Sequence, residues 1–459
     1  MPRDGTVLQT IGNTPLVELR NLDSGCCRLF VKLENQNPTG SIKDRIGLSM
    51  IEAAERDGRI KPGGTLIEAT AGNTGLGLAL VAAQKGYKLI LVIPDKMAQE
   101  KILHLRALGA ETRLTRSDVG KGHPEYYQDI AERLAGEIPN SFYVNQFANP
   151  ANPLAHETTT GPEIWAQMQQ QVDAVVCGVG SGGTLTGLSR YFARVSPATD
   201  IVLADPLGSV LTDVVRTGKI QKEAGTWLVE GIGEDFIPPN CDLARVRHAY
   251  EISDAESFLT AREVLAKEGY LGGSSTGTLV AAALRYCREQ TVPKRVVTFI
   301  CDSGNKYLGK MYNDFWMFEQ GLLPRPKHGT LVDLIVRRYQ EGSAVTLAPS
   351  DSLLLAYRRM KLFEVSQIPV MEGERVIGIL DESDLLLHVY SAPERFKDRV
   401  DTAMVTNVDI IASDAPVADL LPIFQRDHVA IVADGGAGGR FVGLITKIDL
   451  LNYLRQQLV

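Results

Sequence analysis

The chain has 459 residues, of which 44% are hydrophobic and 22% are charged, a balance typical of packed globular domains rather than of disordered tails. Its 48 basic and 55 acidic residues leave a formal net charge of −7, which argues against a nucleic-acid-binding surface. At roughly 100–200 residues per domain, the length predicts two or three domains.

Several sequence signals are missing. The chain does not start with an apolar run typical of a signal peptide, and no run elsewhere reaches the ~20 residues that span a bilayer. The six cysteines have no C-x-x-C spacing, and the seven histidines form no H-x-x-x-H pair. We therefore expect a cytoplasmic protein with buried thiols, without a metal site and without nucleic-acid or membrane partners.

Strands and helices alternate from the start of the chain to about Gln320. Three apolar, β-branched runs predict buried strands, and each is followed by a segment with helical periodicity. The strands are expected at 89–93, 174–177 and 296–300, and the helices over 97–108, from about Thr184, and over 305–318. This alternation predicts an α/β fold with parallel sheets that helices cover on both faces.

After residue 322, a short linker and a repeated segment replace the alternation of strands and helices. Leu323–Gly329 (LPRPKHG) contains two prolines and predicts a linker, so the first domain is expected over 1–322. Beyond it, a segment of roughly 60 residues occurs twice, over about 330–392 and 400–459. Each copy predicts a strand, a helix, two further strands and a second helix. Two such α+β copies are expected to form one C-terminal domain over 330–459.

The first candidate motif is NPTGSIKDR, Asn37–Arg45. Pro38 and Gly40 predict a turn, and Ser41 can cap the helix that follows. Lys43 then lies near a helix N-terminus, where the positive potential disfavours the protonated amine. Such a lysine can form a Schiff base and act as a base, although the motif alone also fits a surface lysine.

Three glycine-rich motifs follow strands or precede helices: EATAGNTGLGLAL (68–80), AVVCGVGSGGTLTG (174–187) and EGYLGGSSTGTLVAAAL (268–284). In the first two, successive small residues let backbone N–H groups converge on an anion at a helix N-terminus. Because no G-x-G-x-x-G opens the first strand–helix unit, one phosphate is a simpler ligand for the second than a dinucleotide. Taken singly, these motifs also fit a capped turn without a ligand or close helix packing.

Together, the four motifs resemble in order and spacing the fold-type II pyridoxal-phosphate enzymes, specifically the cystathionine β-synthase and cysteine synthase group. The segments 11–19 (IGNTPLVEL), 145–164 and 229–238 resemble it too, so the likeness covers residues 5 to 320. The C-terminal repeat resembles a Bateman module, which separates cystathionine β-synthases from plain cysteine synthases. The resemblance implies a catalytic core of two parallel-sheet subdomains followed by an α+β tandem-repeat domain.

This resemblance implies roles for individual residues. Lys43 would be the catalytic residue and would carry pyridoxal 5'-phosphate, Asn73 would hydrogen-bond its phenolic oxygen, and Ser275 would meet its pyridine nitrogen. The cofactor phosphate would lie on Gly180, Ser181, Gly182, Gly183 and Thr184. The substrate carboxylate would lie on Thr70, Ala71, Gly72, Asn73, Thr74 and Gln146.

The implied reaction is a β-replacement that condenses L-serine with L-homocysteine to cystathionine (transsulfuration), with side reactions that form hydrogen sulfide, in a homodimer or higher homo-oligomer. A cysteine synthase that uses O-acetylserine and sulfide is the alternative enzyme, and a non-catalytic adenine-ligand sensor is the alternative of another class. No haem is expected, because the chain opens within about ten residues of the catalytic domain. Three residues depart from the family pattern: Glu234 and Phe147 stand where tyrosine is common, and Ala71 where serine is usual.

The C-terminal repeat suggests a regulatory ligand. In the second copy, Thr446 precedes Asp449 by three residues at a helix start, a spacing with which these modules bind a ribose diol. The resemblance implies S-adenosylmethionine or an adenine nucleotide. In the first copy, Asp381 and Asp384 take these places, which weakens the case for a second site. The alternatives are that the acids only cap helices and that the module only serves oligomer contacts.

Overall fold

The computed structural model describes residues 5–70, 72–95, 99–116, 118–119 and 122–456. The chain divides into two compact units, Met1–Tyr312 and Asn313–Val459, and each is described by itself. The segment 323–329, expected as a linker, contains neither helix nor strand. Each unit has its own hydrophobic clusters.

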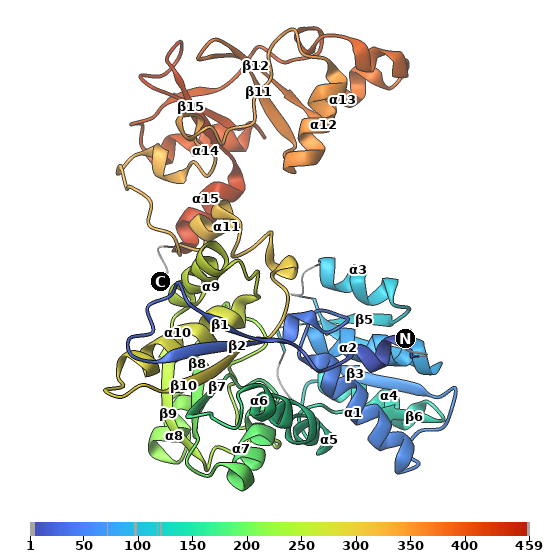
Figure 1. The fold of residues 1–459 in the computed structure, drawn as a ribbon. Helices are drawn as coiled ribbons and strands as arrows, with labels where there is room; N and C mark the ends of the chain where they lie inside the picture. The colour runs from blue at the N-terminus through green and yellow to red at the C-terminus, as the bar shows by residue number, and fades with distance from the viewer. Residues whose placement is uncertain (1–4, 71, 96–98, 117, 120–121, 457–459) are drawn as a thin grey trace. The chain divides into compact units, whose positions relative to one another are not determined.

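The larger sheet of the first unit has six strands in the order β1-β2-β10-β7-β8-β9 (Figure 1). The strands are β1 (Leu16–Leu19), β2 (Arg28–Leu33), β10 (Arg295–Ile300), β7 (Ala174–Cys177), β8 (Asp200–Pro206) and β9 (Val246–Ile252). Every neighbouring pair is parallel except β1 and β2, which are antiparallel. All residues of β7 and β8 are buried, as continuous apolar strands predict.

The smaller sheet of this unit has four parallel strands in the order β5-β4-β3-β6. They are β5 (Glu111–Thr115), β4 (Lys88–Pro94), β3 (Thr65–Ala69) and β6 (Ser141–Tyr143). Leu66 and Leu89 pack into a core with the helices α1 (Lys43–Arg56) and α2 (Asn73–Lys85). Their neighbours Ile67 and Ile90 pack into a second core with α4 (Tyr127–Glu137). Because successive strand residues point to opposite faces, helices cover both sides of this sheet.

The other helices of the first unit connect the strands in a nearly regular alternation (Figure 1). They are α3 (Gln99–Ala107), α5 (Ala151–Ala155), a π-helical turn (His156–Thr160), α6 (Gly161–Gln167), α7 (Gly183–Val195), α8 (Leu211–Thr217), α9 (Asp254–Glu268) and α10 (Ser274–Arg288). The predicted α/β class is therefore confirmed.

The expected helix over 305–318 is wrong. The structure has a 3₁₀ turn, Gly304–Tyr307, and a separate helix α11, Asp314–Glu319. Gly309 interrupts the segment, and the Asn313 side chain accepts a hydrogen bond from the backbone N–H of Phe315 at 2.9 Å. That bond starts a new helix where the periodicity suggested a continuous one.

The second unit contains the two repeats. The first has α12 (Leu353–Phe363), β11 (Gln367–Glu372), β12 (Arg375–Asp381) and α13 (Glu382–Val389), and the second has β13 (Ile410–Ala412), α14 (Leu420–Gln425), β14 (Ala430–Ala433), β15 (Phe441–Ile445) and α15 (Lys447–Gln456). The strand expected first in copy one is reduced to an isolated bridge between Leu347 and Val370. Leu331 and Leu334, at the start of the segment expected as the first copy, pack instead in the core of the second repeat.

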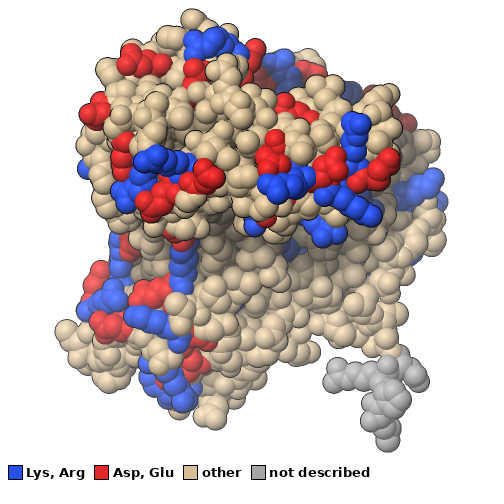
Figure 2. All heavy atoms as spheres, turned by 90° about the horizontal axis from the view of Figure 1, so that it is seen from above, with Lys and Arg blue, Asp and Glu red and all other residues tan. Residues whose placement is uncertain are grey.

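Charged side chains of both signs are interspersed on the face shown in Figure 2, which fits the small net charge. Within the described ranges, every helix is too short or too polar to cross a membrane. In the same part of the chain, no three metal-ligating side chains cluster. The cysteines are free, and Cys27, Cys177 and Cys287 are buried as expected, whereas Cys26 is exposed.

Candidate active site

Two of the three glycine-rich motifs lie at the carboxyl ends of parallel strands, one in each sheet of the first unit. The third precedes α10 and pairs with the segment after β10 through an isolated bridge between Gly272 and Ser303. β3 leads into the loop before α2, β7 into the glycine loop before α7, and β10 into Cys301 and Asp302. A hydrogen bond from Asn73 Nδ2 to Asp302 Oδ2, at 2.8 Å, joins the first of these loops to the last. Ligands of open α/β sheets bind at such strand ends, so this is the candidate active site.

Lys43 is the first residue of α1, and its backbone N–H donates to Ser41 Oγ at 3.2 Å. Gly77 of α2 packs against it so closely that an added Cβ would lie 2.7 Å from the Lys43 carbonyl oxygen. The amine has no hydrogen-bond partner among the described residues. Burial lowers the pKa of Lys43, whereas Cys301, Asp302 and Glu234 raise it. Burial rather than the helix end therefore favours the neutral, nucleophilic amine.

Asn73, the first residue of α2, is held at both ends of its amide. Besides the bond to Asp302, its Oδ1 accepts a hydrogen bond from Lys306 Nζ at 2.6 Å. Tyr307 donates to the same Asp302 oxygen at 2.8 Å. The side chain is thus fixed within the site by residues that follow β10.

The glycine loop 180–184 is supported by two buried side chains from the segment 151–160. Asn152 Nδ2 donates to Ser181 Oγ at 2.9 Å, and His156 Nε2 lies 3.2 Å from Thr184 Oγ1. Burial lowers the pKa of His156 well below its usual value, so this imidazole is neutral. The loop itself needs glycine, because a Cβ on Gly180 would lie 2.5 Å from the Gly231 carbonyl oxygen and Gly182 has a φ of +83°.

The glycine loop fits a phosphate group. It offers two hydroxyls, those of Ser181 and Thr184, directly at the N-terminus of the 13-residue helix α7. Hydroxyls and backbone N–H groups in the field of a helix N-terminus favour an anion. Together with the Lys43 amine, to which no described residue hydrogen-bonds, this donor set fits an aldehyde cofactor that carries a phosphate.

Ser275 is buried near the start of α10, beside the Cys301 thiol. Burial raises the pKa of Cys301 to about 12, although the Lys43 charge and the Ser275 hydroxyl lower it. The thiol is therefore neutral and is no nucleophile at neutral pH. A neutral hydroxyl beside a neutral thiol is the environment that Ser275 offers.

The predicted carboxylate loop is partly described. Thr74 Oγ1 donates to Gln146 Oε1 at 2.6 Å, which leaves the amide nitrogen of Gln146 for another acceptor. The backbone N–H of Gly72 donates to Thr70 Oγ1 at 3.2 Å. Ala71 lies outside the described residues. The structure thus brings Thr70, Gly72, Thr74 and Gln146 together at the end of β3.

Glu234 and Phe147 lie at one side of this site. The Glu234 carboxyl is half-buried against Gly180, and burial and the neighbouring Asp235 and Asp205 raise its pKa to about 8, although Lys43 lowers it. Phe147 packs on Phe236 with ring centroids 5.8 Å apart. A carboxyl group and an apolar ring thus occupy the two positions for which the resemblance implied tyrosine.

Known proteins are similar to this chain along almost its whole length. A family model described as pyridoxal-phosphate-dependent enzyme matches residues 7–302, and the CBS domain model matches residues 336–391 and 399–456. A cystathionine beta-synthase of Dictyostelium discoideum is 36% identical over 98% of this chain and 92% of its own length. The cystathionine beta-synthase of Mus musculus is also 36% identical, over 98% of this chain and 85% of its own.

The chain belongs to the cystathionine β-synthase family of pyridoxal-phosphate-dependent enzymes. Cysteine synthase A of Escherichia coli (strain K12) is 43% identical, but over 65% of this chain and 92% of its own length. The crystal structure of a hydrogen sulfide-producing enzyme from Fusobacterium nucleatum covers 66% of this chain and 99% of its own, with a TM-score of 0.61 and 38% identity.

Membership in the cystathionine β-synthase family confirms several predictions. The fold-type II core, the tandem CBS domains, the pyridoxal phosphate cofactor and the β-replacement class of reaction are as expected. The roles of single residues stay predictions. Sequence reasoning missed Asn152, His156, Asp302 and Lys306, although the first two lie in a segment that resembles the family and Asp302 follows a predicted strand.

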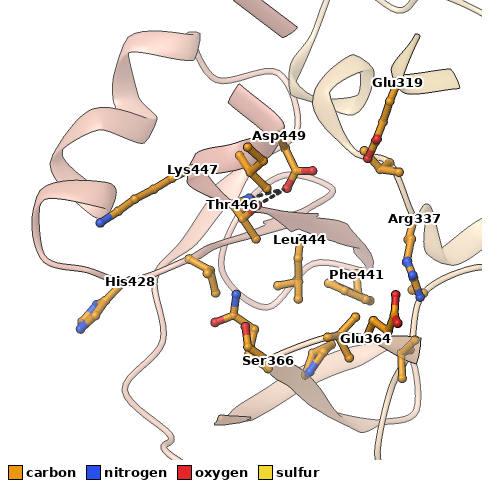
Figure 3. Close-up of a pocket in the computed structure, with 18 of the residues that line it drawn as sticks. Glu319, Arg337, Glu364, Ser366, His428, Phe441, Leu444, Thr446, Lys447 and Asp449 are labelled. Carbon is orange, nitrogen blue, oxygen red and sulfur yellow. Dashed lines mark hydrogen bonds between the residues drawn. The ribbon is translucent and has the colours of Figure 1, made fainter. Parts of the chain in front are cut away.

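The residues for which a regulatory ligand was predicted lie beside a cavity of the C-terminal unit. A cavity of about 550 Å³ opens between the two repeats there (Figure 3). Both repeats line it: Val345, Glu364 and Gln367 on one side, and His428, Phe441, Leu444, Thr446 and Asp449 on the other. Asp449 Oδ2 accepts hydrogen bonds from the Thr446 backbone N–H at 2.7 Å and from its hydroxyl at 2.6 Å.

In the first repeat, the corresponding acids form a helix cap. Asp381 Oδ1 accepts from the Asp384 N–H at 2.7 Å, and Asp384 Oδ2 accepts from the Asp381 N–H at 3.2 Å. This reciprocal capping box occupies both carboxylates at the start of α13. The two acids do not line the cavity, whereas Thr446 and Asp449 do.

Proposed function

We propose that the protein condenses L-serine with L-homocysteine to cystathionine. The observation that carries this proposal is the extent of the match: cystathionine beta-synthases align with 98% of the chain, including both CBS domains, whereas cysteine synthase A aligns with 65%. The second candidate is a cysteine synthase or sulfide-forming activity. It is supported by the 43% identity to cysteine synthase A and by the likeness to a hydrogen sulfide-producing enzyme.

In this proposal, the loop 180–184 holds the cofactor phosphate, Asn73 donates to its ring oxygen, and Ser275 meets its ring nitrogen. When bound, pyridoxal phosphate withdraws electrons from the substrate Cα and makes its proton acidic. Lys43 Nζ, whose pKa burial lowers, would take that proton and pass one to the departing serine hydroxyl, which leaves as water. The homocysteine sulfur would then form the bond to Cβ, and its thiol proton would be returned to Cα through Lys43. Thr70, Thr74 and Gln146 orient the substrate through its carboxylate.

The test is the identity of the product. Serine and O-acetylserine are each combined with homocysteine and with sulfide, and the four mixtures are analysed by mass spectrometry. Cystathionine from serine and homocysteine as the fastest reaction supports the proposal. Cysteine from O-acetylserine and sulfide as the fastest reaction would instead establish the second candidate.

Ser275→Asp is expected to increase transamination relative to β-replacement. A carboxylate beside the ring nitrogen keeps that nitrogen protonated, whereas a hydroxyl does not. The measurement is the ratio of hydroxypyruvate, the keto acid that transamination forms from serine, to cystathionine in a mixture of serine and homocysteine. Ser275→Ala is the control, because it removes the hydroxyl without adding charge. A product ratio like that of the wild type in Ser275→Asp would contradict this role.

For the C-terminal cavity, we propose an adenine ligand, S-adenosylmethionine or an adenine nucleotide, held by Thr446 and Asp449. At a ligand concentration of 100 Kd, binding to the folded unit adds about 2.7 kcal/mol of stability. We expect each candidate that binds to raise the Tm of the full chain, and Asp449→Asn to remove that rise. Asp384→Asn is the matched control, since Asp384 lies outside the cavity. No shift with any candidate would contradict the proposal.

The homo-oligomer, the cytoplasmic location and the lack of haem stay predictions. Size-exclusion chromatography with light scattering measures the oligomeric state. The visible spectrum of the purified protein shows whether haem is bound.

A further inference from the structure

The amide of Asn73 lies between two groups of opposite charge. The Lys306 ammonium donates to Oδ1 at 2.6 Å, and the Asp302 carboxylate accepts from Nδ2 at 2.8 Å. An ammonium only donates and a carboxylate only accepts. Oδ1 and Nδ2 of an asparagine amide have almost the same shape, so their hydrogen-bond partners determine the orientation of the amide. Here both partners select the same orientation.

This orientation leaves a defined donor. Nδ2 carries two hydrogens, and Asp302 occupies one of them. The other N–H remains for a further acceptor in the site. If the amide turned over, Nδ2 would face the Lys306 ammonium and Oδ1 would face a carboxylate, and both contacts would be repulsive. A carbonyl oxygen rather than an N–H would then be presented to a ring oxygen.

Asp302, which accepts a hydrogen bond from Asn73, is itself fixed in position relative to Lys43. The Ile42 N–H donates to the Cys301 carbonyl at 2.9 Å, and the Ser303 N–H donates to the Gly40 carbonyl at 3.0 Å. These two bonds flank Asp302 in one segment and lie just before Lys43 in the other. Asp302 is 2% exposed and also accepts from Tyr307. The position of Asp302 is thus tied to the segment that carries the catalytic lysine.

We propose that Lys306 and Asp302 are positioning residues, which hold the Asn73 amide so that its free N–H donates to the ring oxygen of the cofactor. They act through Asn73 and do not touch the cofactor themselves. This inference rests on the proposed cofactor site and extends it to two residues after β10 that no motif marked.

Lys306→Met tests the inference, because it keeps the length of the aliphatic stem and removes the donor. We expect pyridoxal phosphate to bind the Lys306→Met apoprotein about tenfold more weakly than the wild-type apoprotein, because one hydrogen bond contributes about this much to affinity. We also expect the visible absorbance band of the holoenzyme to shift, together with its pH dependence, since the donor acts on the ring oxygen. Lys306→Arg keeps a donor and is expected to restore most of the affinity and the spectrum.

Lys310→Met is the matched control. Lys310 lies four residues further along the chain and is also ion-paired, but with Glu230 at 2.7 Å. We expect it to keep the wild-type affinity and spectrum. If Lys306→Met fails to fold, Asp302→Asn replaces it. This nearly isosteric change replaces a side chain that only accepts with an amide that can turn either end towards Asn73, and it is expected to shift the band in the same direction.

The outcomes separate the inference from the proposed function. A wild-type protein that takes up no pyridoxal phosphate contradicts the proposed function. A wild-type protein that loads normally, beside a folded Lys306→Met or Asp302→Asn variant with unchanged affinity and spectrum, contradicts this inference alone. A shift of equal size in Lys310→Met would also overturn it, because the effect would then come from the segment and not from the Asn73 contact.

Discussion

Lys43→Ala is expected to lower kcat by at least ~10²–10⁴-fold, the range for loss of a general base, and to remove the visible absorbance of the bound cofactor. The reason is the position of the amine: it is buried in the site, its pKa is lowered by burial, and no described residue hydrogen-bonds to it. Steady-state rates with serine and homocysteine and the absorbance spectrum of the purified protein measure the two effects.

The matched control for this variant is Lys61→Ala. Lys61 is exposed in the loop between α1 and β3, outside the motifs of the site. It is expected to keep both turnover and colour. A Lys43→Ala protein that retained the visible band would show that another lysine carries the cofactor.

Arg45→Met is expected to lower the free energy of unfolding by about 3–5 kcal/mol, the cost of breaking a buried ion pair from one side. Two residues after Lys43, the guanidinium contacts Glu34 at 2.7 Å and Glu163 at 2.7 Å. The side chains of Arg45 and Glu34 are 2% and 0% exposed. Without Arg45, the Glu34 carboxylate is left buried without its cation. Urea denaturation of both proteins measures the difference.

Arg28→Met is the control for Arg45→Met. Arg28 pairs with Glu18 at 2.8 Å, but its side chain is 55% exposed. Exposed pairs contribute about 0–1 kcal/mol, so only a small change is expected. An equal loss of unfolding free energy in Arg28→Met and Arg45→Met would contradict the importance assigned to the buried cluster of Arg45, Glu34 and Glu163.

The contribution of this buried cluster to the free energy of unfolding is expected to depend on pH. Burial alone raises the pKa of Glu163, but the ion pairs with Arg45 and Lys32 outweigh it and lower the pKa to about 2 from 4.5. A carboxyl group with a lowered pKa stabilises the folded state fully above its unfolded pKa, and this contribution disappears as the pH falls through the folded pKa. The stability difference between wild type and Arg45→Met should therefore shrink between about pH 5 and pH 2.

The sequence predicted those parts of the site that lie within single motifs. Apolar runs followed by glycine and a helix mark where β7 ends and α7 begins, and turn residues before a helix mark Lys43 and Asn73. The contact between Asn73 and Asp302 spans 229 residues, and no local pattern predicts a partner at that separation. The helix expected over 305–318 was wrong for a local reason, since Gly309 and the Asn313 cap outweighed its periodicity.

The cause of the lysine's reactivity was also only partly predicted. The position of Lys43 at a helix start was correct, but its lowered pKa comes mainly from burial. Burial depends on how α2 packs against α1 through Gly77, which is a tertiary contact. Similarly, the sequence placed Thr446 and Asp449 together at a helix start, whereas the cavity beside them forms only when both repeats pack.

Chemical capture of the cofactor tests whether Lys43 carries pyridoxal phosphate. The purified holoenzyme is treated with borohydride, digested with a protease and mapped by mass spectrometry. We predict a phosphopyridoxyl group on the peptide that contains Lys43 and on no other lysine. A map with the group on a different lysine, or with none in a protein incubated with excess pyridoxal phosphate, would contradict the account.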